Sequence, residues 1–536
     1  MAKLKQPVAD PAPSRDEPST QPAQPEVERI GKTTVPKPRH DVGLAWLVLL
    51  GLLILAALPL LIDVNTPGVW TEDEALSVAI SSETMQRKAP LVDGETSLES
   101  WTPVYQGESR WDLPPGTTWL HMMSYTGVPI DAASNDDPND TQWVTRARLG
   151  TVAIALLFVA AVFWAGYSIG GLPVGAISGL VAMTMPLLIG FGRHANPHVA
   201  ATAWSALSIA GALWAMRPLR TSPSLIRQLI GWTTCGVGLG LATLTLGPVA
   251  IPGTLLCTVV LAMICPRRIG HIMGLIASTA IAALMLMPWA MHVHDHDPEI
   301  YQQWIAQLRP DFDTLGLGDV LARAGWRLSL AAAISGLWFI WLVPALIQPF
   351  STSTGDARRR LMLGWGWLVT ALLLVAFAPG ETTYAGLLIA VAPASVAIGL
   401  IMRQFHDLSA EGRHARLWQV GKWLVCAGML VLAIGLPLTG HLLNHQPQLV
   451  DWLPSTERSM LATMHWSFWA GAAGALLLAS VLATRFALYN HPGRTTACLA
   501  VWMLILFGLA AIPMSRSEYF NTAYDPPIKV ERSARL

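Results

Sequence analysis

Long apolar runs alternate along the chain with short polar segments. The first run, residues 43–62, has no charged residue over about 20 positions, which matches the thickness of the hydrocarbon core of a bilayer. It is too long, and too far from the first residue, for a cleaved signal peptide. Comparable runs follow at residues 144–167, 172–190, 196–216, 226–245, 248–265, 269–290, 327–347, 360–378, 382–402, 419–440, 464–486 and 495–513. The pattern predicts an all-α polytopic membrane protein with about thirteen transmembrane helices.

The basic residues predict which way these helices run. Arginines gather in alternate connections, and Lys and Arg are retained on the cytoplasmic side. These arginines are Arg217, Arg220, Arg227, Arg267, Arg268, Arg358, Arg359, Arg360, Arg403, Arg413, Arg416, Arg485 and Arg494. The protein is therefore expected in the cell (plasma or inner) membrane, with the N-terminus on the cytoplasmic side and the C-terminus outside.

Three domains of different character follow from this topology. Residues 1–40 are rich in Pro, Ser, Thr and charge and predict a disordered cytoplasmic tail. Residues 41–514 form the transmembrane domain, and residues 515–536 a short outside tail. The long outside segments 63–143, 291–326 and 441–463 carry most of the loop carboxylates, so function is expected there.

The amino-acid composition excludes several functional classes of protein. The chain has 536 residues, 52% hydrophobic and 13% charged, with 35 basic and 35 acidic residues and no net charge. This balance excludes nucleic-acid binding, which needs a basic surface, and a disordered solvating protein. The five cysteines lie in or beside apolar runs, which argues against a disulfide framework or a zinc cluster.

The first outside segment contains predicted structure of its own. Residues 71–74 (TEDE) form a T-x-x-E capping box, and the apolar residues Leu76, Ala79 and Ile80 follow at helical spacing. They predict an amphipathic helix on the membrane surface. A second short surface helix is expected after the Pro pair of residues 110–116 (RWDLPPG). The acidic residues of the first helix either stabilise the helix start, by accepting free N–H groups and interacting with the positive end of the dipole, or take part in catalysis.

The order of these features resembles a known family. After the first span come an outside acidic pair, a Pro-Pro-Gly followed by Trp, and Ala-Arg-Leu at residues 147–149; further matches are residues 191–196 (FGRHAN), 240–248 (GLATLTLGP), 287–292 (MPWAMH) and 381–384 (ETTY). Together they resemble, over residues 44 to about 400, the GT-C glycosyltransferases of the aminoarabinose transferase and protein O-mannosyltransferase type. The resemblance implies a GT-C-type bundle and a hexosyl- or pentosyltransferase of the cell envelope. Such an enzyme takes a sugar from a polyprenyl-phosphate donor to a lipid, protein or glycan acceptor on the outer face.

The resemblance also implies roles for individual residues. Asp73 matches the catalytic base, while Glu74 either orients Asp73 or closes the capping box. Guanidinium groups bind phosphate with two parallel hydrogen bonds, so Arg148 and Arg193 are expected at the donor phosphate, and Arg110 as a replacement for a missing lysine. The expected substrate contacts are Trp111, His194, Asn196 and Tyr384.

The chain departs from the family pattern at four positions. The chain has Leu113, Leu246 and Glu381 where the family has lysines. It has Asn196 where the family has an aspartate. Only about 20 residues follow the last span, so a soluble C-terminal domain and a lipid A acceptor are not implied. A catalytically decayed GT-C-like scaffold therefore remains an alternative. A transporter is disfavoured because the spans hold few ionisable residues and show no repeat.

Histidines at the end of the seventh span offer a possible metal site. Residues 292–297 (HVHDHD) supply imidazole and carboxylate ligands, and His292, His294 and His296 are the candidates for a divalent metal. Alternate residues share a face only in an extended strand, so the segment equally marks the exit of the span into a polar loop. No dinucleotide fingerprint, P-loop or H-E-x-x-H motif is present, and no cofactor is otherwise expected.

Overall fold

The computed structural model describes residues 42–62, 64–65, 72–88, 101–126, 141–216, 224–266, 268–307, 316–352, 355–378, 384–412, 416–445 and 466–516. Residues 1–44 and 45–536 are two separate units, and the description below concerns the second. The predicted tails, 1–40 and most of 515–536, lie outside the described residues, and so do residues 446–463 of the predicted outside segment 441–463.

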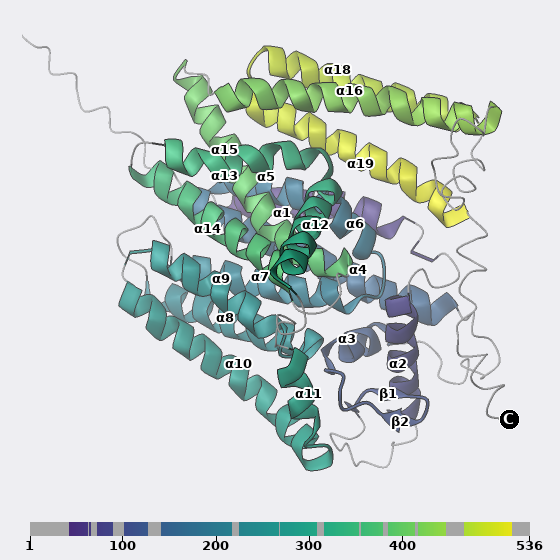
Figure 1. Ribbon diagram of the computed structural model, residues 1–536, viewed down its shortest axis with the longest axis vertical. Coiled ribbons are helices and arrows are strands. Elements are labelled where there is room, and N and C mark those ends of the chain that lie inside the picture. Colours follow the sequence, from purple (N-terminus) through teal and green to yellow (C-terminus); the bar gives the residue numbers. More distant parts are fainter. Residues whose placement is uncertain are drawn as a thin grey trace, which may run out of the picture. The chain divides into compact units, whose positions relative to one another are not determined.

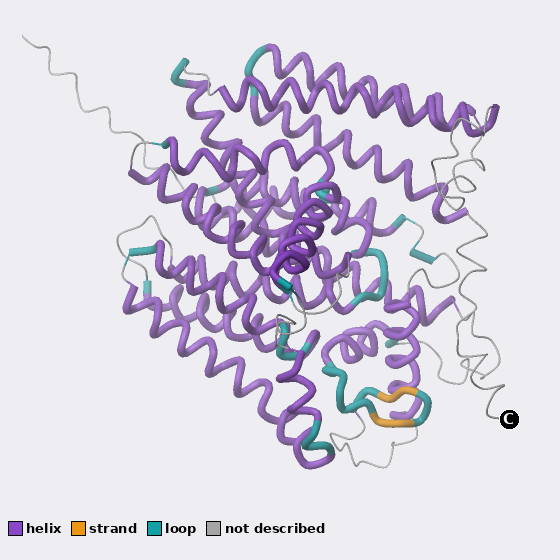
Figure 2. Tube along the Cα trace, viewed as in Figure 1, coloured by secondary structure: helices purple, strands orange, loops and turns teal. Residues whose placement is uncertain are grey.

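The described chain is almost entirely helical (Figures 1 and 2). Nine of its helices are long and apolar enough to cross a membrane, or ten if one bent pair is a single span. The nine lie in α1 (Val42–Leu61), α4 (Thr141–Gly170), α7 (Pro197–Met216), α8 (Leu225–Leu246), α10 (Arg268–His296), α14 (Gly355–Phe377), η5 with α15 (Tyr384–Ala390, Val391–Ala410), α16 (Arg416–His445) and α18 (Trp466–Leu488). The polytopic all-α class is confirmed, whereas the count of thirteen is not.

Three of the predicted spans are shorter helices within the described residues. They are α5 (Leu172–Met183), α9 (Ala250–Ile264) and the described apolar part of α19 (Pro492–Arg516). The run 172–190 is not one helix because Pro186 starts a new short helix, α6 (Pro186–Phe191), and the preceding Met185 is extended. A proline disfavours helical geometry in the residue before it, so the helix stops there. With twelve residues, α5 is about 18 Å long and cannot cross alone.

The predicted span 327–347 is instead a bent pair. Helix α12 (Leu317–Ile334) begins ten residues earlier than expected and is followed by η4 (Gly336–Trp338) and α13 (Phe339–Ser351). The two long arms meet at 111°. Gly336 at the bend has φ +58°, a conformation that glycine adopts without steric cost.

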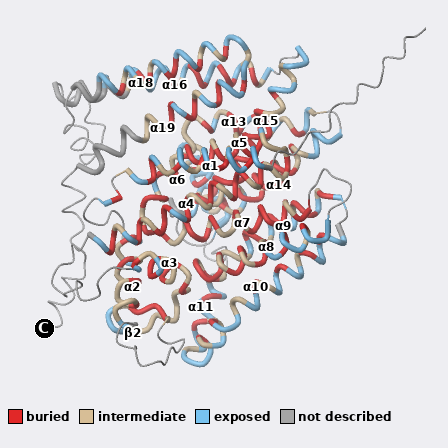
Figure 3. The backbone as a smooth tube through the Cα atoms, turned by 180° about the vertical axis from the view of Figure 1, so that it is seen from behind, coloured by how far each residue is buried: buried red, intermediate tan, exposed pale blue. Residues whose placement is uncertain are grey.

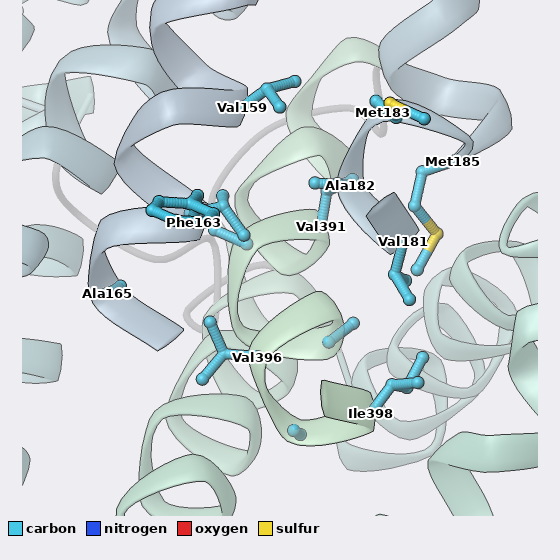
Figure 4. Close-up of a cluster of buried hydrophobic side chains, with 14 of the residues drawn as sticks. Val159, Phe163, Ala165, Val181, Ala182, Met183, Met185, Val391, Val396 and Ile398 are labelled. Atoms are coloured by element: carbon cyan, nitrogen blue, oxygen red, sulfur yellow. The ribbon is translucent and has the colours of Figure 1, made fainter. Parts of the chain in front are cut away.

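The core lies where α4, α5 and α15 meet. Figure 4 shows Val159 and Phe163 of α4 beside Val181 of α5 and Val396 of α15, all four of them fully buried. Around this core, α15 is mostly buried and α10 is mostly exposed (Figure 3). Many of the exposed residues of α10 are large and apolar, among them Ile269, Met273 and Leu284, as expected for a helix that faces lipid.

Residues 63–143, the first segment predicted to lie outside, contain helices α2 (Glu72–Lys88) and α3 (Gly116–Ser124), as the sequence predicts. Between them lies a small antiparallel pair, β1 (Val104–Tyr105) and β2 (Glu108–Ser109), which the sequence pattern does not predict. Its turn is formed by Gln106 and Gly107, both with positive φ, and the Glu83 carboxylate of α2 accepts both of their N–H groups. Helices α2 and α3 pack on each other, and α3 also packs on α4 and α8. This layer positions the candidate site.

Candidate functional site

A buried ion pair lies beneath helix α2. Arg148 donates from Nε and Nη2 to Oε1 and Oε2 of Glu74, at 2.8 and 3.0 Å. Glu74 is 0% exposed and Arg148 is 1% exposed. Two parallel charge-assisted hydrogen bonds fix both the separation and the rotation of the two groups. The pair therefore locks the first turn of α2 onto α4.

The same two side chains also hold the chain on either side of α2. Arg148 donates from Nη1 to the carbonyl of Val64 at 3.3 Å, and the N–H of Ala195 donates to Glu74 Oε1 at 3.1 Å. Arg193 lies nearby and donates to the carbonyl of Ile62 at 2.7 Å. The network thus joins the segment after α1, the start of α2, α4 and the connection between α6 and α7.

Asp73 lies directly before Glu74 in α2, but its side chain is exposed. Consecutive residues on a helix point about 100° apart, so one turn presents Asp73 outward while Glu74 is buried. His198, at the start of α7, lies within electrostatic reach of Asp73. The exposed carboxylate of Asp73 therefore lies on a helix turn that the buried Glu74–Arg148 pair fixes in place.

Two histidines lie beside the ion pair. Burial lowers the pKa of His194 to about 4. The charge of Glu74 raises this pKa, whereas the charges of Arg148 and Arg193 lower it. Burial likewise lowers the pKa of His121 to about 4, again opposed by Glu74. Both imidazoles are therefore neutral at neutral pH. His121 was not identified from the sequence, because a single histidine in a short helix carries no motif.

Asn196, an expected substrate contact, caps a helix here. It is 1% exposed, and its Oδ1 accepts the N–H of His198 at 2.8 Å in the first turn of α7. An amide oxygen in this position satisfies one of the free N–H groups at a helix start. Tyr384 begins η5, but its side chain lies outside the described residues, as does Glu381.

Arg110 and Trp111 lie on the connection between β2 and α3. Arg110 donates two hydrogen bonds to the Asp112 carboxylate, at 2.8 and 2.7 Å, and holds the pKa of that carboxyl below its usual value. Trp111 stacks on His296, with ring centroids 4.5 Å apart, and on Trp289 at 6.2 Å. These contacts fasten the connection to the C-terminal end of α10.

The three candidate metal ligands do not converge. His292 and His296 both contact Trp111, whereas His294 contacts Tyr301. Among the described residues, no group of three His, Cys, Asp or Glu side chains could hold a metal ion. These contacts give the histidines an aromatic packing role.

Two sequence motifs far apart in the chain meet in space. Thr117, after the Pro-Pro-Gly of α3, donates to the carbonyl of Thr245 at 3.4 Å. A Cβ added to Gly116 would lie 2.7 Å from the carbonyl oxygen of Leu244, so only glycine allows this approach. The positions of Leu113 and Leu246, where the family has lysines, therefore belong to neighbouring segments.

The chain is similar in sequence to curated arabinosyl transferases. The chain is 23% identical over 403 residues to the undecaprenyl phosphate-alpha-4-amino-4-deoxy-L-arabinose arabinosyl transferase of Pectobacterium carotovorum, covering 73% of this chain and 64% of that protein. It is 23% identical over 411 residues to the enzyme of the same name from Pectobacterium atrosepticum, covering 74% and 66%. The chain thus spans just under two thirds of the length of the curated relatives it matches. No family model matches it.

The fold itself is shared with a solved structure. The crystal structure of ArnT from Cupriavidus metallidurans bound to undecaprenyl phosphate superposes with a TM-score of 0.65 at 17% identity, over 88% of this chain and 77% of that one. The apo structure of the same protein gives 0.63. The resemblance inferred from the sequence and the polytopic GT-C-type fold are therefore confirmed.

Proposed function

We propose that the protein is a membrane glycosyltransferase that moves a sugar from a polyprenyl-phosphate donor to a lipid, protein or glycan acceptor on the outer face of the membrane. The fold shared with ArnT supports this class of enzyme. The observation that carries the proposal is the exposed Asp73 on a helix turn that Glu74 and Arg148 hold rigidly.

Asp73 is the proposed general base. In the reaction, an acceptor hydroxyl or amine attacks the anomeric carbon, its proton passes to the Asp73 carboxylate, and the bond to the polyprenyl phosphate breaks. A base is effective only where it is accessible and fixed in place. Asp73 is exposed, and its neighbour is anchored by two hydrogen bonds to Arg148, so it meets both conditions.

The leaving phosphate needs positive charge near it. Of the three arginines expected there, Arg148 and Arg193 are 1% and 6% exposed and bind Glu74 and the Ile62 carbonyl. We assign them the positioning of α2 instead. Arg110, about a third exposed, is the proposed phosphate contact, through Nη1, since its two hydrogen bonds to Asp112 use Nε and Nη2.

A second function, a decayed scaffold, has one observation in its favour. Leu113 and Leu246 stand where the family has lysines, and the two segments that carry them lie together. Neither side chain can contact a phosphate through charge. A scaffold would retain the fold and the Glu74–Arg148 pair without turnover.

Release of polyprenyl phosphate separates the two functions. The purified full-length protein would be incubated with undecaprenyl-phosphate aminoarabinose, the donor named for the relatives, and with a lipid extract that contains other polyprenyl-phosphate sugars. Mass spectrometry would follow free polyprenyl phosphate over time. Multiple turnovers with any donor support the enzyme, and no release above a protein-free control with every donor supports the scaffold.

A further inference from the structure

A polar cavity lies at the far end of α4 from Arg148. It has a volume of about 550 Å³ and lies between the end of α13, the start of α14 and the end of α15, which pack together (Figure 1). Val174, at the start of α5, also lines it. Arg148 and Gly170 lie near opposite ends of α4, about 33 Å apart at 1.5 Å per residue. The cavity is therefore about one membrane thickness away from the proposed active site.

The three carboxylates that line the cavity all have partners. Asp407 binds Arg403, whose Nε and Nη2 lie 3.1 and 3.0 Å from the two carboxylate oxygens. Asp356 pairs with Arg359 at 3.8 Å, and Glu411 has a partner of its own. A cation that entered would find each carboxylate already engaged, so the lining does not select positive charge.

Arg360, on α14, carries the charge that is not compensated. It is half-buried and lines the cavity, and its guanidinium forms no ion pair with the part of the chain that the structure describes. Its Nε is buried and has no hydrogen-bond partner there either. Phosphate matches the planar fork of a guanidinium with two parallel hydrogen bonds. The lining therefore selects an anion.

Gln404, on α15, adds a second requirement. The Thr352 hydroxyl donates its one proton to the carbonyl of Gln348 at 2.9 Å, so its oxygen can only accept from Gln404, and it does so from Nε2 at 2.9 Å. This contact fixes the amide orientation and leaves Oε1 as a buried acceptor without a partner among the described residues. An acceptor of this kind is costly unless a donor reaches it. Since no carboxylate remains to favour an ammonium, the fitting donor is a neutral hydroxyl.

We propose that this cavity binds an anionic glycerol phosphate, with the phosphate on Arg360 and a glycerol hydroxyl donating to Oε1 of Gln404. The headgroup of phosphatidylglycerol and soluble glycerol 3-phosphate both carry this pair of groups. Because Arg360 belongs to α14 and Gln404 to α15, the bound group bridges the ends of two helices. The site lies apart from the sugar transfer and does not rest on the proposed function.

The position is suitable for a lipid headgroup. Arg360 and Gln404 lie near the ends of two candidate spans, Gly355–Phe377 and Gly386–Ala410. Arginines near the ends of spans extend to the level of the headgroups. Asp356 and Asp407 line the cavity and are exposed, so it opens to the protein surface. A headgroup that enters there keeps its acyl chains beside the helices.

Native mass spectrometry tests the proposal on the full-length protein. The protein would be equilibrated with equal amounts of dioleoyl phosphatidylglycerol, phosphatidylethanol and phosphatidylethanolamine. Phosphatidylethanol is anionic but has no headgroup hydroxyl, whereas phosphatidylethanolamine has an N–H donor but no net charge. We expect phosphatidylglycerol to be retained about tenfold more than either, since each of them leaves one buried group unsatisfied or its charge uncompensated. Equal retention of phosphatidylglycerol and either other lipid would overturn the proposal.

Variants locate the binding in the cavity. Arg360→Met should reduce retention of phosphatidylglycerol about tenfold, because the hydrogen bonds to a charged group are lost. Arg358→Met removes the same charge from an exposed position two residues earlier on α14 and should change retention by less than about twofold. Equal retention by the two arginine variants would contradict a phosphate contact at Arg360.

Gln404→Leu gives an independent readout. It removes the acceptor for the hydroxyl, so the variant should retain phosphatidylglycerol and phosphatidylethanol alike, within about twofold. This comparison is made within one variant and decides the question if Arg360→Met fails to fold, judged by its melting temperature. A preference for phosphatidylglycerol that persists in Gln404→Leu would refute the role of Gln404 and with it the proposal.

Soluble glycerol 3-phosphate identifies the source. If it displaces the lipid at millimolar concentration, the cavity takes the soluble compound, and if the lipid alone binds, the cavity takes a headgroup. Both results support the glycerol phosphate site. Binding of neither probe would refute it.

Discussion

At the scale of single residues, the pair of Glu74 and Arg148 decides how α2 is held. Both side chains are fully enclosed, so removal of one partner leaves a buried charge without compensation. We predict that Arg148→Met and Glu74→Gln each lower the free energy of unfolding by about 3–5 kcal/mol. Thermal unfolding in detergent measures the loss.

Arg146 provides the matched control for this prediction. It lies two residues before Arg148 on α4 and is exposed. Arg146→Met should cost less than about 1 kcal/mol, as is usual for an exposed charge. Equal losses in the two arginine variants would show that the buried pair does not stabilise the fold.

The two buried histidines predict a dependence of stability on pH. The pKa of His121 and of His194 is about 4 in the folded protein, against about 6.5 in an unfolded chain. Between these values the unfolded chain binds more protons, so stability is fully present above pH 6.5 and falls as the pH drops towards 4. Each histidine contributes up to about 1.4 kcal/mol per pH unit.

Melting temperatures between pH 4 and pH 8 would measure this dependence. His121→Asn removes one of the two groups and should make the acid limb shallower. An unchanged acid limb in the variant would mean that His121 does not bind a proton on unfolding in this range.

At the scale of elements, α3 is held against α8 by a close backbone approach. Gly116→Ala would place a Cβ 2.7 Å from the Leu244 carbonyl oxygen, and backbone cannot yield as a side chain can. We predict a destabilisation of about 1–3 kcal/mol and a separation of the two motifs that meet there. Unfolding midpoints and the trypsin sensitivity of the first outside segment would detect both effects.

Gly190→Ala is the control for this substitution. No heavy atom lies within 4 Å of the Cβ that it would add. The exchange should leave stability within about 0.5 kcal/mol. If both glycine variants melt alike, the contact of α3 with α8 is not as tight as described.

The elements also show how far sequence reasoning reaches. Apolar runs and the two surface helices could be predicted because burial in lipid and on the membrane surface leaves a periodic pattern. The break before Pro186 is indicated by the proline itself, but the residues on both sides are apolar, so the run 172–190 looks like one span. The bend at Gly336 carries no such signal, because glycine is common in membrane helices and only its φ of +58° reveals the turn.

The candidate site was only partly predictable for a similar reason. The acidic turn and Arg148 stood out as charges in apolar surroundings, but their pairing joins residues 74 positions apart. The roles of Ile62, Val64 and Ala195 depend on backbone atoms, which every residue has. Sequence thus identified the charged groups and not which of them bind one another.

At the scale of the whole molecule, the topology predicted from the basic residues would place Asp73 and Arg359 on opposite sides of the membrane. The five native cysteines are buried or half-buried, so an introduced thiol would dominate labelling. We predict that Leu76→Cys in α2 is labelled by an impermeant maleimide from outside whole cells, and that Arg359→Cys is labelled only after permeabilisation. Labelling of both from the same side would contradict the predicted orientation.

The central claim is that Asp73 is the base of a glycosyl transfer. The direct test compares release of polyprenyl phosphate by the wild-type protein, Asp73→Asn and Asp319→Asn at equal folded amounts. Asparagine keeps the size of aspartate but cannot accept the proton, so Asp73→Asn should lower release by about 10²-fold or more. Asp319, also exposed and in the first turn of its helix, is the matched control and should keep wild-type release when substituted. Wild-type release by Asp73→Asn would contradict the account.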